Sequence, residues 1–134
     1  MSEVVTLVLK DAIARPGEKF SCVVLLAPND ERVSTAAGLT VRLEWRASYG
    51  GLRLESQTVA KWSPDLPLRM EYIVPLALPD DAPITWAGKL VRIDWAVIAE
   101  LDVPWKKDPA VTESLHVLPR GVRHRSSEEQ AIAR

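Results

Sequence analysis

A strict two-residue alternation between Val91 and Val103 constrains the fold of this chain more than any other feature. The apolar positions of the alternation are Val91, Ile93, Trp95, Val97, Ala99, Leu101 and Val103. Charged side chains occupy four of the six positions between them. A strand points successive side chains to opposite faces, whereas a helix would scatter these charges around its whole surface. The segment is therefore predicted to be one long strand with a buried face and a mostly wet face.

Similar alternation recurs along most of the chain. Further strands are predicted at residues 4–9, 20–26, 39–47, 52–62, 68–74 and 111–118. Pro16-Gly17 and Gly50-Gly51 supply the backbone freedom for two tight turns. Helix is indicated only at residues 30–37 and near the C-terminus. This pattern predicts an all-β fold, a two-sheet antiparallel β-sandwich, and leaves a closed barrel open as the alternative.

Composition indicates one packed domain and excludes several classes of partner. Hydrophobic residues make up 47% and charged residues 26% of the 134 residues, the balance of a folded globular chain. The net charge of -1 provides no broad field to attract nucleic acid or an anionic membrane. No apolar run approaches the ~18 to 20 residues of a membrane span. No nucleic-acid partner and no membrane span are therefore expected.

The supply of cysteine and histidine limits the chemistry further. Cys22 is the single cysteine, and there are two histidines. One thiol cannot close a disulfide within the chain, and these residues cannot supply the usual zinc ligand sets. No metal and no cofactor are predicted, and the cytoplasm is the expected compartment.

The C-terminal segment differs from the body of the chain. Residues 120–134 contain four arginines against two glutamates. Ser126 and Glu129 match a capping box, so a short helix is one expectation, but a segment of this length is unstable on its own. We therefore divide the chain into a β-sandwich domain, residues 1–119, and a basic tail, residues 120–134, that is disordered or a short helix.

The residues that could carry catalysis each have a structural explanation. His116 lies on a predicted strand, where a solvated histidine is the ordinary case. Cys22 lies inside an apolar strand, where burial raises the pKa of a thiol and makes it a poor nucleophile. Asp80 and Asp81 are adjacent in a proline-bounded loop, so their carboxylates tend to diverge. The sequence therefore predicts that the protein is not an enzyme.

The five tryptophans divide into two groups. Trp45 and Trp95 occupy inward positions of alternating segments and are predicted to lie in the core. Trp62, Trp86 and Trp105 lie near strand ends or loops, where they either plug the ends of the sandwich or form a stacking platform. The second possibility predicts a binding module for a small carbohydrate or lipid, with these three rings as its ligand-binding residues.

One stretch of sequence resembles a known family. A strand ends in a Leu78-Pro79 loop with a second proline at Pro83, then an aromatic and a glycine, Trp86-Ala87-Gly88. The long strand that follows ends in the phrase Ala99-Glu100-Leu101-Asp102-Val103-Pro104-Trp105. This order resembles the arrestin-like superfamily, and Arg15-Pro16-Gly17-Glu18 is similar to the family's first hairpin. The resemblance implies an immunoglobulin-like β-sandwich that acts as a protein-binding adaptor or scaffold.

The resemblance also suggests how such a domain would bind. Members of the family generally place two sandwiches side by side, whereas residues 4–118 match one. A homodimer is therefore one expectation, supported by aliphatic side chains on nominally wet faces at Ile73, Ala96 and Ile98; strand addition at an exposed sheet edge is another. The leading hypothesis is a non-enzymatic interaction domain that binds an unidentified protein partner through strand edges, loops or the tail.

Overall fold

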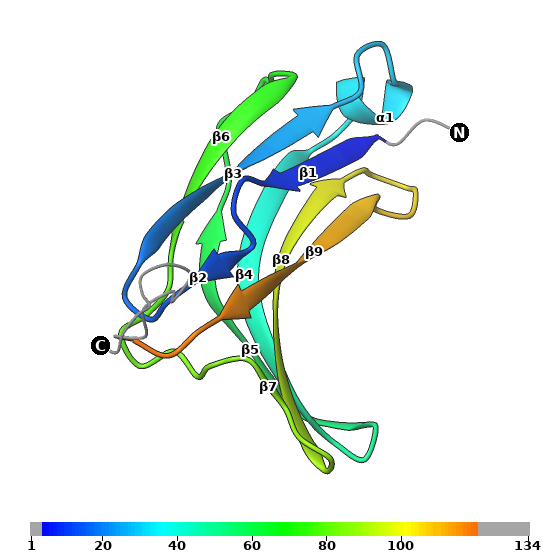
Figure 1. The fold of residues 1–134 in the computed structure, drawn as a ribbon. Helices are drawn as coiled ribbons and strands as arrows, with labels where there is room; N and C mark the ends of the chain where they lie inside the picture. Colours follow the sequence, from blue (N-terminus) through cyan, green and yellow to red (C-terminus); the bar gives the residue numbers. More distant parts are fainter. Residues whose placement is uncertain (1–3, 121–134) are drawn as a thin grey trace.

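Residues 4–120 are described in a computed structural model of the chain, and they form two packed β-sheets of unequal size (Figure 1). The smaller sheet has the strand order β1-β3-β6. The larger sheet has the order β2-β9-β8-β4-β5, and β7 pairs with β8 outside that path. The elements are β1 (Val5–Leu9), β2 (Ile13–Ala14), β3 (Lys19–Leu26), α1 (Glu31–Ser34), β4 (Gly38–Tyr49), β5 (Leu52–Trp62), β6 (Glu71–Ala77), β7 (Trp86–Ala87), β8 (Val91–Asp102) and β9 (Ala110–Val117).

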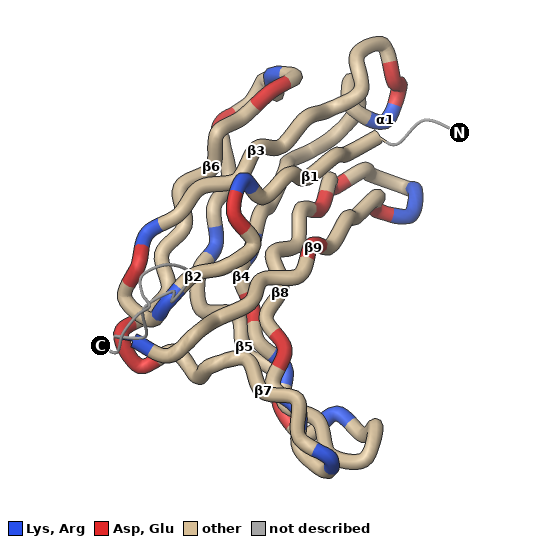
Figure 2. Tube along the Cα trace, viewed as in Figure 1, with Lys and Arg blue, Asp and Glu red and all other residues tan. Residues whose placement is uncertain are grey.

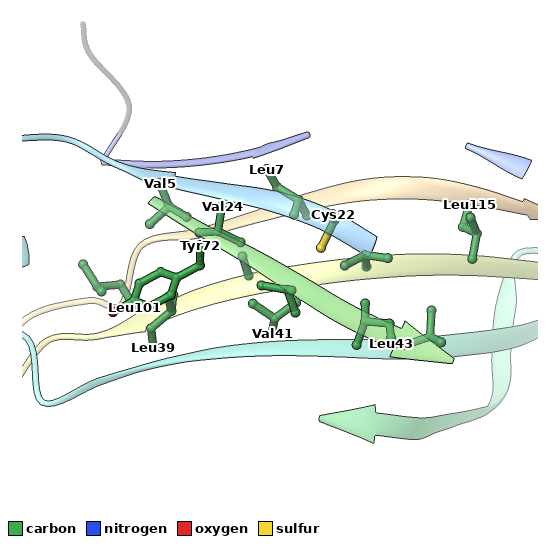
Figure 3. Close-up of a cluster of buried hydrophobic side chains, with 14 of the residues drawn as sticks. Val5, Leu7, Cys22, Val24, Leu39, Val41, Leu43, Tyr72, Leu101 and Leu115 are labelled. Atoms are coloured by element: carbon green, nitrogen blue, oxygen red, sulfur yellow. The ribbon is translucent and has the colours of Figure 1, made fainter. Parts of the chain in front are cut away.

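The apolar core lies between the two sheets, where the alternating side chains meet (Figure 3). Val41 and Leu43 of β4 stand beside Ala99 and Val97 of β8 on the inner face, and all four are fully buried. Val24 of β3 faces them from the smaller sheet and is equally buried. The two-sheet sandwich predicted from the alternation is confirmed. The described strands form two separate sheets, so the barrel alternative is wrong.

The predicted elements match the observed ones closely, with differences at one longer strand, two very short strands and the helix. The strand expected over residues 68–74 begins only at Glu71, because the N–H of Arg69 donates to the Tyr72 hydroxyl instead of to a neighbouring strand. The prediction missed β2 and β7, which have two residues each and are too short to show a period. The helix indicated at residues 30–37 is α1, and it spans a single turn.

The larger sheet extends well beyond the smaller one. β4 and β8 have 12 residues each and pair along their whole length, whereas β1, β3 and β6 have five, eight and seven. The far parts of β4, β5, β7 and β8 consequently project from the sandwich as a thin ribbon (Figure 1). We call this projection the arm and define it as residues 46–57 and 86–94.

The burial of two side chains, Trp45 and Ile98, differs from what their positions in the alternation predict. Trp45 is half-buried, because it lies at the boundary between the sandwich and the arm, where it lines a hollow together with Pro79 and Pro83 of the covering loop.

Ile98 points to the outer face, yet it is 3% exposed. Its cross-strand neighbours there are Arg42 and Thr112, and an arginine stem beside an isoleucine can remove it from water. Ile98 therefore gives no support to an exposed dimer surface.

Trp95 is the largest fully buried side chain, and its replacement tests the core. It is 2% exposed, and its Nε1–H donates to the carbonyl oxygen of Pro83 at 2.6 Å. Trp95→Ala should lower the free energy of unfolding by about 3 to 5 kcal/mol through the cavity it leaves. The measurement is urea unfolding, with the fully exposed Trp105→Ala as the matched control, expected to change by less than about 0.5 kcal/mol. A loss below about 1 kcal/mol for Trp95→Ala would contradict the register.

Cys22 gives a second test of the core. It is 1% exposed, and burial raises the pKa of its thiol from 9.0 to about 11. The free energy that burial of the neutral thiol contributes is therefore fully present below pH 9 and is lost as the pH rises toward 11. In a mildly alkaline buffer the folded protein should react with a thiol reagent far more slowly than the urea-unfolded protein. Equal rates in the two states would show that Cys22 is accessible.

Candidate functional site

The three tryptophans singled out as ligand-binding residues lie in different surroundings. Trp62 ends β5, is half-buried and makes an edge-to-face contact with Tyr72, with ring centroids 5.3 Å apart. Trp86 lies on the arm and is 53% exposed. Trp105 follows β8 in a turn with a positive φ of 66°, and its side chain is fully exposed. Each ring therefore has a separate environment.

The strand register shows how far apart two of these rings are. Trp62 is opposite Val41 on β4, whereas Trp86 is opposite Ile93 of β8, which is itself opposite Ala47. Six residues of β4 separate the two levels, a rise of ~20 Å along the strand. The fold thus does not bring Trp62 and Trp86 into one platform.

The candidate catalytic residues are also dispersed. His116 is exposed on β9, and Cys22 is enclosed in the core. Asp80 forms an ion pair with Arg120 at 3.2 Å, while Asp81 is exposed beside it. Within residues 4–120, no three His, Cys, Asp or Glu side chains are grouped so that they could hold a metal ion. The described part of the chain also contains no helix that is long and apolar enough to cross a membrane.

The sequence did not indicate one further surface feature, an apolar groove. It lies at the α1 end of the sandwich, between α1 and the loop that enters β6, and has a volume of about 760 Å³. Its apolar lining consists of Val33, Ala36, Leu66, Pro67, Leu68 and Met70. Asp30 and Glu31 add two carboxylates on the α1 side. The groove therefore combines aliphatic surface with negative charge.

The α1 wall of the groove is built by a helix cap. Asp30 accepts a hydrogen bond from the backbone N–H of Arg32 at 2.9 Å and begins the helix. The Arg32 guanidinium also donates to the Asp30 carboxylate, at 3.1 and 3.2 Å. These hydrogen bonds hold the pKa of Asp30 below its ordinary value and raise the pKa of Arg32. Val33 anchors the turn by pointing into the core, so the Asp30 charge is held in place.

The opposite wall is held by Tyr72. Its hydroxyl accepts a hydrogen bond from the N–H of Arg69 at 2.7 Å, and the Arg69 guanidinium lies 5.1 Å from the ring centroid. The carbonyl of Met70 accepts from the N–H of Leu26 at 2.8 Å. These hydrogen bonds hold the backbone of the loop at Arg69 and Met70, and on the same loop Leu66 is 55% and Met70 is 41% exposed.

Sequence reasoning missed the groove because its walls are far apart in the chain. Residues 29–36 and 66–70 meet only through the fold. The exposed Met70 was placed in a strand alternation, which gave it an apparent structural role. The one signal in the sequence was the run Leu66-Pro67-Leu68. It places aliphatic side chains in a segment whose prolines predict a loop.

Comparison with known proteins supports the fold. No model of a protein family matches the chain, and no curated protein matches its sequence. Among solved structures, the chain is similar to Spo0M, a sporulation control protein from Bacillus subtilis, with a TM-score of 0.56 and 21% sequence identity. The match covers 84% of this chain and 48% of that protein, so the chain spans about half the length of its structural neighbour. The likeness supports the predicted fold, an arrestin-like β-sandwich, while membership of the superfamily stays a prediction.

Tyr72→Phe tests whether the hydroxyl holds the groove wall. Without its acceptor, the N–H of Arg69 should exchange faster with solvent, and the free energy of unfolding should fall by about 0.5 to 1.5 kcal/mol. Amide hydrogen exchange and urea unfolding measure the two effects. Tyr49→Phe, at an exposed tyrosine of the arm, is the matched control and should change neither. Unchanged exchange at Arg69 in the Tyr72 variant would show that the hydroxyl is not a necessary anchor.

Proposed function

We propose that this protein is a non-enzymatic interaction domain of arrestin-like type, which binds a segment of a partner protein in the groove between α1 and the 66–70 loop. The observation that carries the proposal is the combination of exposed aliphatic side chains with two carboxylates in one groove. An uncovered apolar surface of this kind is typical of a protein-binding site. The likeness to a sporulation control protein supports a role in regulation by interaction.

The charges on the groove indicate the chemistry of the segment it would accept. Asp30 is already bound to Arg32, but Glu31 has 77% of its side chain exposed and only a 3.9 Å contact with Lys106. A carboxylate this exposed remains available to a cation of a partner. The proposed ligand is therefore an extended or helical segment with aliphatic side chains for Leu66 and Met70 and a lysine or arginine for Glu31.

The free edge of β5 is a less suitable surface for strand addition. β5 ends the larger sheet, and its residues 52–58 are exposed. Its register against β4 is interrupted twice, between Leu43 and Glu44 and between Ala47 and Ser48 on the β4 side. Bulges of this kind bend an edge strand and shorten the regular stretch that a partner strand could pair with. The groove is for this reason the preferred contact surface.

The small-ligand alternative has less support. Trp62 and Trp86 are on different levels of the sheet, and none of the three loop tryptophans lines the groove. A carbohydrate or lipid site built on stacked rings needs convergent aromatics. The cytoplasm remains the proposed compartment, since Cys22 is a free, buried thiol.

A displayed peptide library tests the proposed function directly. The full chain is immobilised and the library is selected for binding. We expect enrichment of peptides that combine aliphatic residues with lysine or arginine. The double variant Leu66→Ser, Met70→Ser should lose at least about tenfold in affinity for the enriched peptides, since two aliphatic contacts are removed. Glu31→Gln should lower the affinity for the enriched peptides by a few-fold and reduce the salt dependence of their binding.

The matched control is Leu52→Ser, Leu90→Ser, which removes two similarly exposed leucines at the opposite end of the molecule. It should leave peptide affinity unchanged. Enriched peptides whose affinity does not respond to the groove variants, or a consensus that is acidic, would refute the groove as the binding site.

A further inference from the structure

The far end of the arm consists of two hairpin turns that a backbone hydrogen bond joins. β4 and β5 are joined through Gly50-Gly51, whose positive φ angles of 56° and 87° suit a two-residue turn that few other residues adopt. The second turn is closed by the N–H of Gly88, which donates to the Val91 carbonyl at 3.0 Å. The N–H of Gly50 donates to the Leu90 carbonyl at 2.9 Å and joins the two turns. We call residues 49–54 and 86–92 the arm tip.

The arm tip carries a concentration of exposed apolar side chains. Six large ones lie on it, namely Tyr49, Leu52, Leu54, Trp86, Leu90 and Val91. Leu52 is 72% and Leu90 is 59% exposed. The smaller sheet ends before the arm, so no described strand covers these side chains (Figure 1). A cluster of this size on a projecting end indicates contact with another apolar surface.

The charge of the arm tip has one sign. Its only charged residues are Arg53, Lys89 and Arg92, and it contains no aspartate or glutamate. Arg92 contacts Asp94 just behind the tip at 3.3 Å, whereas Arg53 and Lys89 form no ion pair with any residue of 4–120. Figure 2 shows these basic positions at the end of the arm and acidic residues nearer the sandwich. The near-zero net charge of the chain thus conceals a local separation of charge.

We propose that the arm tip docks on the surface of an anionic lipid bilayer. The leucines would enter the boundary between headgroups and acyl chains, where Tyr49 and Trp86 also find their preferred environment. Arg53 and Lys89 would contact the anionic headgroups. The attraction acts within about one Debye length, ~10 Å, so it does not require a net positive protein.

The same charges disfavour the two other occupants of an apolar tip. A second copy docked tip to tip would bring Arg53 and Lys89 close to the same cations of its partner. The core of a protein–protein interface is depleted of charge, particularly of lysine, whereas here the exposed Lys89 lies between Gly88 and the exposed Leu90. An anionic bilayer accepts both the leucines and the cations. The groove lies at the opposite end of the sandwich, so both surfaces can be occupied together (Figure 1).

Vesicle sedimentation tests this proposal with the full chain. The vesicles contain phosphatidylcholine alone, or phosphatidylcholine with about one third phosphatidylglycerol. We expect binding only to the anionic vesicles, with a decrease at high salt. Arg53→Gln, Lys89→Gln should lower the partition coefficient about 25-fold, since each cation near an anionic surface contributes about fivefold. The double variant Leu52→Ser, Leu90→Ser should lower the partition coefficient at least about tenfold.

Tryptophan fluorescence gives a second measurement. The emission of Trp86 should shift to the blue when the protein binds the anionic vesicles, and Trp86→Phe should remove that shift.

Leu66→Ser, Met70→Ser, at the groove end, is the matched control and should bind vesicles like the unchanged protein. Thermal unfolding checks that every variant is folded. No binding to the anionic vesicles would overturn the proposal, as would equal binding to both vesicle types. Binding that the tip variants leave unchanged would place the attraction elsewhere, for example in the basic residues 120–134, and would also overturn it. A tip-dependent dimer in light scattering without vesicle binding would identify a second copy as the occupant. A negative result for vesicle binding leaves the proposed protein-binding groove intact, because the groove and the arm tip consist of different residues.

Discussion

The burial of the inner face of β4 and β8 is the interaction on which the rest of the structure depends. These two strands pair along all 12 positions, and their inward side chains form the floor of the core. The smaller sheet covers only part of that floor because its strands have at most eight residues. The covered part is the sandwich, and the uncovered part is the arm. Both the stability of the domain and the exposure of the arm tip therefore follow from one mismatch in strand length.

The two ends of the molecule differ because different loops cover them. At the arm end, the carbonyl oxygen of Pro83 accepts a hydrogen bond from the Trp95 indole N–H, and the loop that contains Pro83 lines a hollow together with Trp45. At the other end, α1 and the 66–70 loop are held apart by their own hydrogen bonds, which leaves a groove between them. One end is thus apolar and basic, and the other is apolar and acidic.

Much of the fold could be predicted from the sequence. The alternation in residues 91–103 predicted the position of β8 within one residue and the burial of Trp95, and the apolar strand around Cys22 predicted the burial of its thiol. The position of a residue in the alternation shows which face of its sheet the side chain occupies, but not whether another layer of the fold covers that face. For this reason Trp45 packs against the core but is only partly buried, and Ile98 is enclosed although it lies on the outer face. The division at residue 119 stays a prediction, because residues 121–134 lie outside the described part of the chain.

The sequence alone determined most of the strands and their inward side chains, because a strand's period of two is a local property that each segment displays by itself. The choice between a sandwich and a closed barrel needed the tertiary structure. The tertiary structure alone decided which apolar residues remain in contact with water. Leu52, Leu66, Met70 and Leu90 have ordinary places in the sequence, and they are exposed because of how far a neighbouring sheet or loop reaches. The groove and the arm tip also join residues that are far apart in the chain, as Gly50 and Leu90 are. Such surfaces depend on non-local packing, which no window of sequence contains.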